Sequence, residues 1–214
     1  GDETFRYCEK LTKLTVKGNI ESIDSSVFYN TAIKELQVGK GVSSLKRTLY
    51  GQGALEKIEV EEGNESYISE DGVLYNKGKT KLIRYPQSKS DQTEYKVPDG
   101  VKTIGEYAFN RNKTITKVEL PDSVQTINAY AFCNCENLEE IKLSEGLETI
   151  GNYVFAYCNG IKKADIPNSV KALGADTFYD CDSLEEVVLG KGLEKVGDET
   201  FRYCEKLTKL TVKG

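Results

Sequence analysis

The sequence has no histidine, no methionine and no tryptophan among its 214 residues. The lack of histidine excludes a Ser-His-Asp triad, a Cys-His pair, histidine-ligated zinc and an imidazole base. The lack of methionine leaves no natural start residue, so we expect a fragment or a processed product. No apolar run approaches the length of about 18 residues that a transmembrane helix needs, and no signal peptide opens the chain.

Excess positive charge is lacking too. Lysine and arginine number 29 against 34 aspartate and glutamate residues, which gives a net charge of -5. A chain with this balance is poorly suited to the phosphate backbone of nucleic acids. We therefore expect no nucleic-acid partner and no direct membrane insertion. Six cysteines are also too few for a small domain held together by disulfides.

What the sequence does contain is a repeat of 22–23 residues. Phenylalanines recur every 23 residues at Phe109, Phe132, Phe155, Phe178 and Phe201, and the same step separates Phe5 from Phe28. Cysteine follows phenylalanine by three residues at Cys8, Cys135, Cys158, Cys181 and Cys204. Leucine or isoleucine opens the units at Leu11, Ile33, Leu55, Ile115, Leu138, Ile161, Leu184 and Leu207. In a degenerate third unit, Tyr50 and Gly53 replace the phenylalanine and the cysteine.

A unit this short cannot bury its own apolar face, so neighbouring units must stack and share one core. The run L-x-x-I-x-L alternates apolar and polar positions, which predicts a short half-buried strand. Proline, glycine or serine then turns the chain, and Ala131-Phe132 fits a short helical turn with phenylalanine in the core. The predicted fold is an α/β, β-rich, right-handed solenoid of about nine parallel strand turns, forming a single domain over residues 1–214.

Residues 61–94 interrupt the period. Within them, residues 73–75 and 82–85 predict the two strands of a β-hairpin. The run GKT at residues 78–80 resembles the end of a phosphate-binding loop, but Gly72 lies one residue too far away and no helix follows. We therefore expect a hairpin insertion and no bound nucleotide.

The two ends of the chain repeat one another. Residues 1–18 and 197–214 are identical, whereas the other units share only their framework positions. A longer array with a super-repeat of eight turns would explain this identity, and an engineered duplication is the alternative. Both ends carry ordinary core residues where a polar cap is typical, at Phe5, Leu11, Leu14, Leu207, Leu210 and Val212. Uncapped ends predict head-to-tail self-association.

The repeat resembles the leucine-rich repeats of BspA-like bacterial surface proteins. The resemblance covers nearly the whole chain and rests on the runs LPDSVQTI at residues 120–127 and IGNYVFAYC at residues 150–158. Residues 71–86, DGVLYNKGKTKLIRYP, are similar to a hairpin that recurs in that family. The resemblance implies a leucine-rich-repeat solenoid, an extracellular location on the bacterial surface and a role in adhesion. It implies no shared active site.

Charged residues on the outward face of the predicted strands alternate in sign. The row before the central apolar position comprises Lys13, Glu35, Lys57, Lys117, Glu140, Lys163, Glu186 and Lys209. Opposite charges on neighbouring strands attract, so a self-neutralised ladder is the first interpretation. The following outward row includes Lys142 and Asp165 and has no obvious ligand signature. Concave solenoid faces bind partners, so Glu140, Lys142, Lys163, Asp165 and Glu186 remain candidate ligand-binding residues.

A second candidate site is a row of tyrosines. Tyr107, Tyr130 and Tyr153 each lie two residues before a core phenylalanine, so we expect them to stack along one edge. Tyrosine is favoured in contacts with proteins and glycans. A ladder that merely covers the turns is the alternative interpretation.

The cysteine column predicts small buried side chains beside the core. Parallel strands about 4.8 Å apart bring neighbouring cysteines near disulfide distance, but identical stacked side chains point the same way. We expect no metal, because the thiols do not converge. Cys133 is the thiol expected to be exposed and reactive. The sequons at Asn64 and Asn112 are expected to be idle.

These observations predict a non-catalytic module for binding or adhesion that recognises protein or glycan on host or neighbouring cells. No cofactor is expected. A structural spacer that projects another domain is the alternative, and an enzyme is least favoured because no base or nucleophile constellation is visible.

Overall fold

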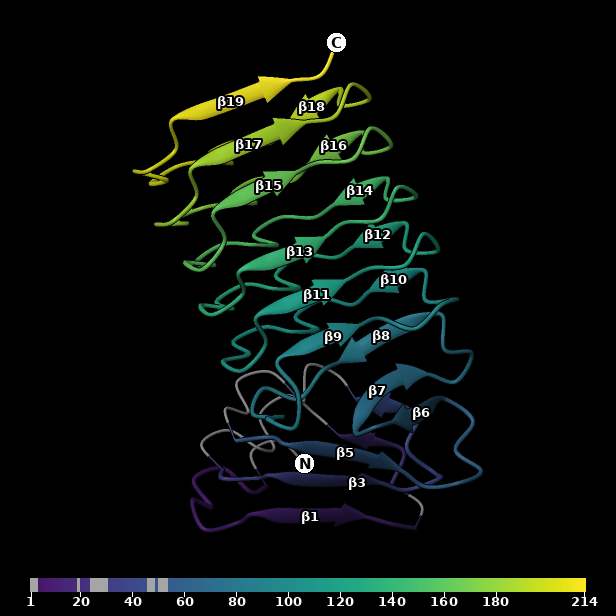
Figure 1. Ribbon diagram of the computed structural model, residues 1–214. Coiled ribbons are helices and arrows are strands. Elements are labelled where there is room, and N and C mark those ends of the chain that lie inside the picture. Colours follow the sequence, from purple (N-terminus) through teal and green to yellow (C-terminus); the bar gives the residue numbers. More distant parts are fainter. Residues whose placement is uncertain (1–3, 19, 24–30, 46–48, 50–53) are drawn as a thin grey trace. The chain divides into compact units, whose positions relative to one another are not determined.

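The computed structural model describes residues 4–18, 20–23, 31–45, 49 and 54–214 (Figure 1). The chain forms two compact units, residues 1–90 and residues 91–214, which we call the N-terminal and the C-terminal unit. The prediction of a single domain over residues 1–214 stays a prediction. Phe28, Tyr50 and Gly53, which the repeat pattern uses, lie outside the described residues. No helix in the described part of the chain is long and apolar enough to cross a membrane.

The N-terminal unit contains two kinds of sheet. Its parallel strands are β1 (Lys13–Val16), β2 (Ser22–Ile23), β3 (Glu35–Val38), β4 (Ser44–Leu45) and β5 (Lys57–Val60). They pair in the orders β1-β3-β5 and β2-β4. Strands β6 (Tyr67–Glu70), β7 (Val73–Asn76) and β8 (Lys81–Arg84) form an antiparallel meander. The predicted hairpin is therefore confirmed as β7 and β8, and β6 adds a strand that the sequence pattern did not predict.

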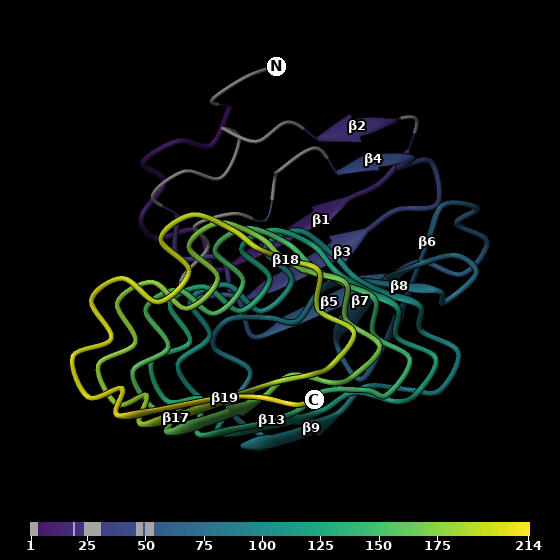
Figure 2. The same ribbon diagram turned by 90° about the horizontal axis from the view of Figure 1, so that it is seen from above.

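The C-terminal unit is a stack of parallel strands whose partners lie one repeat apart (Figures 1 and 2). One column holds β9 (Glu94–Lys96), β11 (Lys117–Glu119), β13 (Glu140–Lys142), β15 (Lys163–Asp165), β17 (Glu186–Leu189) and β19 (Lys209–Val212). The other holds β10 (Thr103–Ile104), β12 (Thr126–Ile127), β14 (Thr149–Ile150), β16 (Ala172–Leu173) and β18 (Lys195–Val196). The first column divides into two sheets, β9-β11-β13 and β15-β17-β19. The predicted parallel solenoid is confirmed.

Stacked phenylalanine rings form the core of the C-terminal unit. Phe132 is fully buried, and its ring centroid lies 4.7 Å from that of Phe109 and 5.5 Å from that of Phe155. Phe178 lies 5.1 Å beyond Phe155, and Phe201 lies 5.7 Å beyond Phe178. Because each ring contacts its equivalents in the adjacent repeats, the repeats share one continuous apolar core.

The expected short helical turns are wrong, since the segments around the core phenylalanines are non-helical turns. In the turn that holds Phe109, the backbone is left-handed at Tyr107 (φ 57°) and Arg111 (φ 58°). Alternate N–H groups of this turn bond to the next repeat, as Phe109 N does to Ala131 O at 2.7 Å. The N–H of Asn110 bonds locally to Tyr107 O. In an α-helix, successive N–H groups beyond the first turn all bond to the C=O four residues earlier in the same segment, so this alternation excludes a helix.

The cysteines next to the core act as small hydrogen-bond donors. The thiols of Cys135, Cys158 and Cys181 each donate to the carbonyl oxygen of the phenylalanine 26 residues earlier, at 3.1 Å. Cys204 does the same at 3.0 Å. The predicted burial is thus confirmed for these four cysteines but is wrong for Cys8, and each of the four thiols also ties one repeat to the preceding repeat. All six cysteines are free thiols.

The prediction that Cys133 is exposed and reactive is wrong. Cys133 is 5% exposed, and burial raises the pKa of its thiol to about 11. The left-handed residues Tyr130 and Asn134 fold the turn so tightly that Ala131, Phe132 and Cys133 are all buried. The exposed thiol is Cys8.

We expect Cys8 to react first with a chromogenic disulfide reagent at pH 8. A thiol with a pKa about two units above its ordinary value holds about 100-fold less thiolate, and burial also blocks access to Cys133. Thiol labelling followed by peptide mapping measures the order of reaction. The Cys8→Ser variant should lose the fast phase and keep all slow phases, whereas fast labelling of Cys133 would contradict the structure.

Candidate functional site

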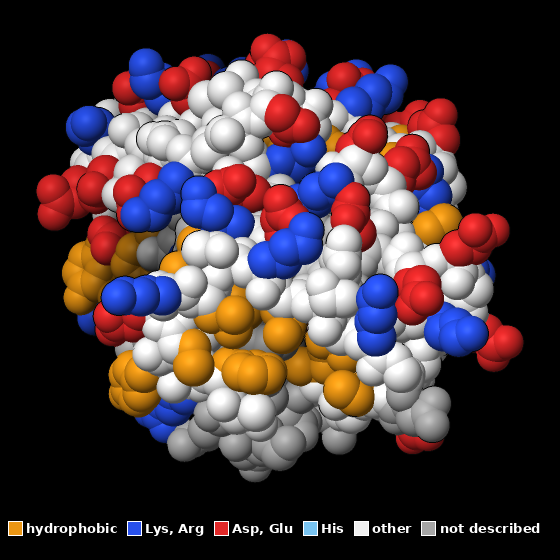
Figure 3. Space-filling view, turned by 90° about the horizontal axis from the view of Figure 1, so that it is seen from below, with side chains coloured by type: hydrophobic (Ala, Val, Ile, Leu, Met, Phe, Trp, Pro, Cys, Tyr) orange, Lys and Arg blue, Asp and Glu red, His pale blue; other side chains and the backbone are white. Residues whose placement is uncertain are grey.

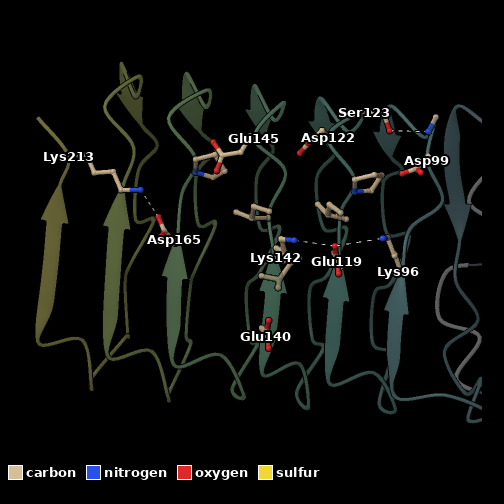
Figure 4. Close-up of a pocket in the computed structure, with 16 residues that line it drawn as sticks. Lys96, Asp99, Glu119, Asp122, Ser123, Glu140, Lys142, Glu145, Asp165 and Lys213 are labelled. Atoms are coloured by element: carbon tan, nitrogen blue, oxygen red, sulfur yellow. Dashed lines mark hydrogen bonds and ion pairs between the residues drawn. The ribbon is translucent and has the colours of Figure 1, made fainter.

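A groove opens on the strand face of the C-terminal unit, at the carboxyl ends of β9, β11, β13 and β15 (Figure 4). Its volume is about 710 Å³. The apolar part of its lining comes from Leu120, Pro121, Ile141, Leu143 and Pro167. The groove spans the place where β13 and β15 form the edges of two separate sheets. This interruption of the strand ladder distinguishes the groove from the rest of the column.

The wall of the groove carries a row of ion pairs. Glu119 lies between Lys142, at 3.2 Å, and Lys96, at 4.0 Å. The hydrogen bond from Lys142 and the neighbouring ammonium charges lower the pKa of Glu119. Further along the row, the ammonium group of Lys213 reaches back to Asp165 at 2.9 Å. These lysines are therefore already engaged by carboxylates of the protein.

A second row of carboxylates is unpaired. Asp99, Asp122 and Glu145 occupy equivalent positions in three successive repeats, in the turns directly after the strands. No ion pair joins any of them to another residue in the described ranges. The lining contains the six acidic side chains of Asp99, Glu119, Asp122, Glu140, Glu145 and Asp165 and the three lysines of Lys96, Lys142 and Lys213. The groove consequently has an excess of negative charge.

The candidate charged residues do not form a single site. Glu140, Lys142 and Asp165 line the groove, whereas Lys163 and Glu186 lie outside its lining. Glu186 bridges two lysines, Lys163 at 3.6 Å and Lys209 at 2.9 Å. The predicted charge ladder is confirmed where Glu186 pairs with Lys163 and Lys209. It is also confirmed for Lys13 with Glu35 at 2.6 Å and for Lys117 with Glu140 at 3.0 Å.

The tyrosines stack as predicted. The ring centroids of Tyr107 and Tyr130 are 4.8 Å apart, and those of Tyr130 and Tyr153 are 4.9 Å apart. The ring planes deviate from parallel by 1° and 5°, respectively. A hydrogen bond with the Asp176 carboxylate is the main cause that raises the pKa of Tyr153. Tyr130 has both ring faces covered by its neighbours. A ligand beside the row therefore meets mainly ring edges and hydroxyl groups.

Sequence reasoning missed the unpaired row of Asp99, Asp122 and Glu145. The signal was available as a column of acidic residues at 23-residue spacing, placed directly after the residue that turns the chain. Reasoning from the strands alone judged the row that holds Lys142 and Asp165 to lack a ligand signature. In the structure, Glu119, Lys142 and Asp165 of this row form the groove wall.

The face drawn in Figure 3 carries charges of both signs. Figure 3 shows lysine and arginine interspersed with aspartate and glutamate over one face, beside a cluster of hydrophobic side chains. No group of three metal-ligating side chains with suitable geometry occurs among the described residues. At the sequons, the side chains of Asn64 and Asn112 are buried, with 1% and 0% exposed. Both amides are therefore inaccessible in the folded chain.

Comparison with known proteins places the fold in a family. A family model described as the BspA type leucine-rich repeat region, in six copies, matches residues 1–95 and 80–208. No curated protein sequence matches the chain.

Solved structures agree with the family model. The pneumococcal vaccine antigen PcpA is 32% identical with a TM-score of 0.87, and the match covers 100% of this chain and 54% of that protein. A leucine-rich repeat protein from Eubacterium ventriosum is 31% identical with a TM-score of 0.86, over 93% of this chain and 55% of that one. A leucine-rich cell surface protein from Faecalibacterium prausnitzii is 27% identical with a TM-score of 0.84, over 99% and 62%. The chain thus spans less than two thirds of the length of each of these proteins. From the repeat, the stacked core and these matches, the chain belongs to the family of BspA-type leucine-rich repeat proteins.

Proposed function

We propose that this chain is a non-catalytic binding module of a bacterial cell-surface protein, and that its groove binds an extended, basic segment of a partner protein. The observation that carries the proposal is the row of unpaired carboxylates, Asp99, Asp122 and Glu145, along a groove of about 710 Å³. Lysine or arginine side chains of a bound segment would neutralise this row. The aliphatic part of those side chains would pack against the apolar part of the groove lining.

A surface location is supported by the similar proteins, one of which is described as a vaccine antigen and another as a cell surface protein. A polypeptide partner is favoured over a glycan because the tyrosine row offers few free ring faces for a sugar. Glycan binding through the hydroxyl edge of Tyr107, Tyr130 and Tyr153 is the competing outcome of the test.

The test is fluorescence anisotropy with a labelled Lys/Arg-rich peptide of about ten residues and with an acidic peptide of equal length. We expect saturable binding of the basic peptide, weakened by added salt because the charges are exposed. Replacing all three carboxylates (Asp99→Asn, Asp122→Asn and Glu145→Gln) should weaken binding about tenfold, because three exposed pairs contribute a few tenths of a kcal/mol each.

A variant with the same change in net charge provides the control. Glu136, Asp182 and Glu205 are exposed and lie outside the groove lining, so their amide replacements should leave affinity unchanged. If both triple variants lost the same affinity for the basic peptide, the effect would come from net charge alone. That result would contradict binding in the groove. A glycan panel with a Tyr107/Tyr130/Tyr153 triple alanine variant, shown to remain folded, tests the tyrosine row.

A structural spacer is the second candidate function, and the continuous phenylalanine core supports it. The stacked phenylalanine core and the backbone bonds between repeats give the C-terminal unit resistance to bending. Absence of any saturable partner up to about 1 mM would favour this role.

A further inference from the structure

The backbone ladder of the C-terminal unit is interrupted between β13 and β15. At the two neighbouring junctions the residue after the strand donates to the next repeat, as Leu120 N does to Lys142 O at 3.0 Å and Ile166 N does to Val188 O at 2.8 Å. Leu143 is the equivalent residue after β13. Within the described residues, no backbone bond of this kind runs from Leu143 to β15, and no strand pairing joins β13 to β15.

The two strands are also separated by more than one strand spacing. Most Cα–Cα distances between β13 and β15 exceed 8 Å. Figure 4 shows a wider separation between the strand of Lys142 and that of Asp165 than between the other neighbouring strands. Paired strands lie about 4.8 Å apart, so a further strand needs a separation of about 9.6 Å. On the opposite side of the same two repeats, β14 and β16 remain paired. The interruption therefore lies on the strand face.

The interruption uncovers apolar side chains of the core. Ile141 and Leu143 are half-buried, whereas their equivalents in the preceding repeat, Val118 and Leu120, are 0% and 3% exposed. On β15 the corresponding inward residue is the small Ala164, where β11, β13 and β17 carry valine or isoleucine. The groove thus has apolar surface and space at the level where a further strand would place its inward side chains.

The backbone groups beside the gap point into it. In a parallel strand, the backbone groups of successive residues point to opposite neighbours. Lys142 O accepts from β11, so the N–H and C=O groups of Ile141 and Leu143 point toward β15. Ile166 N donates to β17, so by the same alternation the backbone groups of Asp165 point toward β13. One strand placed in the gap can therefore bond to both edges.

We propose that the partner segment of the proposed function, on which this inference rests, binds as an additional β-strand between β13 and β15. Its backbone bonds to both edges, which supplies affinity, and its alternate side chains supply specificity. Apolar side chains on its inward face cover Ile141, Leu143 and Ala164. Lysine or arginine beside them pairs with Asp122 and Glu145. The ligand class is a segment with apolar residues at alternate positions next to basic residues.

N-methylation of a bound peptide tests strand insertion. The probe is a labelled lysine-rich peptide of about ten residues with two valines separated by one residue, measured by fluorescence anisotropy with the full chain. Neighbouring residues of an inserted strand bond to opposite edges. N-methylation of the first valine and, separately, of the residue between the valines should therefore each weaken binding about tenfold. N-methylation of the terminal residue is the control and should leave affinity unchanged.

The pattern of losses identifies the binding mode. A loss at only one of the two central positions would mean that the segment lies on one strand edge. A loss at neither position would mean that side chains alone hold the segment. Either result would overturn insertion between β13 and β15.

Amide hydrogen exchange measured by NMR locates the bound segment. Saturating peptide should slow exchange about tenfold at the N–H groups of Ile141, Leu143 and Asp165, which face the gap. Exchange at Glu140 should not change, because its N–H already bonds to Thr116 O at 3.1 Å. Protection of the three amides in the free chain would show that β13 and β15 pair directly, and would overturn the proposal.

Failure of this inference is distinguishable from failure of the proposed function. If the unmodified peptide binds and the carboxylate variant weakens it, but the amides that face the gap stay unprotected, then strand insertion is wrong and the basic-segment groove stands. If the unmodified peptide does not bind, the proposed function is wrong and strand insertion is wrong with it.

Discussion

The Phe132→Ala variant should lose about 3–5 kcal/mol of unfolding free energy, as measured by urea denaturation. The side chain is fully buried between two stacked rings, at 4.7 and 5.5 Å, so its removal leaves a cavity in the shared core. Both adjacent repeats border that cavity, and neither can close it without breaking the backbone bonds that fix their spacing.

Phe201→Ala is the matched control for this result. Phe201 is half-buried, and within the described ranges its ring stacks on that of Phe178 alone, at 5.7 Å. Its removal should cost about 1–2 kcal/mol, mainly through the lost apolar area. Equal losses at the two positions would show that the core is not continuous through the stack.

The Asn64→Asp variant should destabilise the N-terminal unit by about 3 kcal/mol at pH 7. Asn64 is 1% exposed, and its Nδ2 donates to the carbonyl oxygens of Gly39 and Val42, both at 2.9 Å. Its Oδ1 accepts from the N–H groups of Ser66 at 2.8 Å and Tyr67 at 2.7 Å. Aspartate keeps the accepting oxygen but turns its second oxygen, buried and negative, toward two carbonyl oxygens.

The pH dependence of the Asn64→Asp effect tests this cause. Burial and the two carbonyl oxygens disfavour the charged acid, so its pKa in the folded chain should lie above that in the unfolded chain. The folded state then binds the proton more tightly, and the difference from the parent chain should shrink as pH falls through the folded pKa. Asn168→Asp, at an exposed asparagine whose oxygen accepts from Lys191 N at 3.1 Å, should change stability by under about 0.5 kcal/mol. A loss at Asn64 that does not vary with pH would contradict this mechanism.

Strand positions were predictable because the repeat constrains them twice. Alternation along β11 or β17 marks the buried positions, and the 23-residue step aligns each strand with its neighbours. The stacking of Tyr107 on Tyr130 follows from the same step. Any feature that depends only on register was therefore visible in the sequence.

Turn geometry was not predictable in the same way. Ala131-Phe132 is compatible with a helical turn, but tyrosine at position 130 adopts a left-handed backbone that its residue type does not suggest. The bonds to the neighbouring repeat hold this conformation, so the cause lies outside the local sequence. The burial of Cys133 is a consequence of the same geometry.

The acidic column of the groove was visible in the sequence, but the pairing of the other charges in its lining was not. Lys213 pairs with Asp165, which lies 48 residues earlier in the sequence. In the repeat between them, the position in register with Asp165 is the uncharged Val188. Asp99, Asp122 and Glu145 carry the same sign at equivalent positions of three successive repeats, so they offer one another no opposite charge. The alternation of charge signs along one row of strand residues predicts neither the Lys213–Asp165 pair nor the unpaired carboxylates.

The backbone bonds between repeats also determine the electrostatics of the C-terminal unit along its stacking direction. In the turn segments, N–H groups such as those of Phe109 and Phe132 point to the following repeat. Beside the short strands, N–H groups such as those of Gln125 and Asn128 point to the preceding repeat. The two columns of peptide dipoles therefore oppose one another, unlike the aligned dipoles of an α-helix. Opposed columns partly cancel, so the backbone adds a weaker field along this direction than the same number of aligned peptide dipoles would.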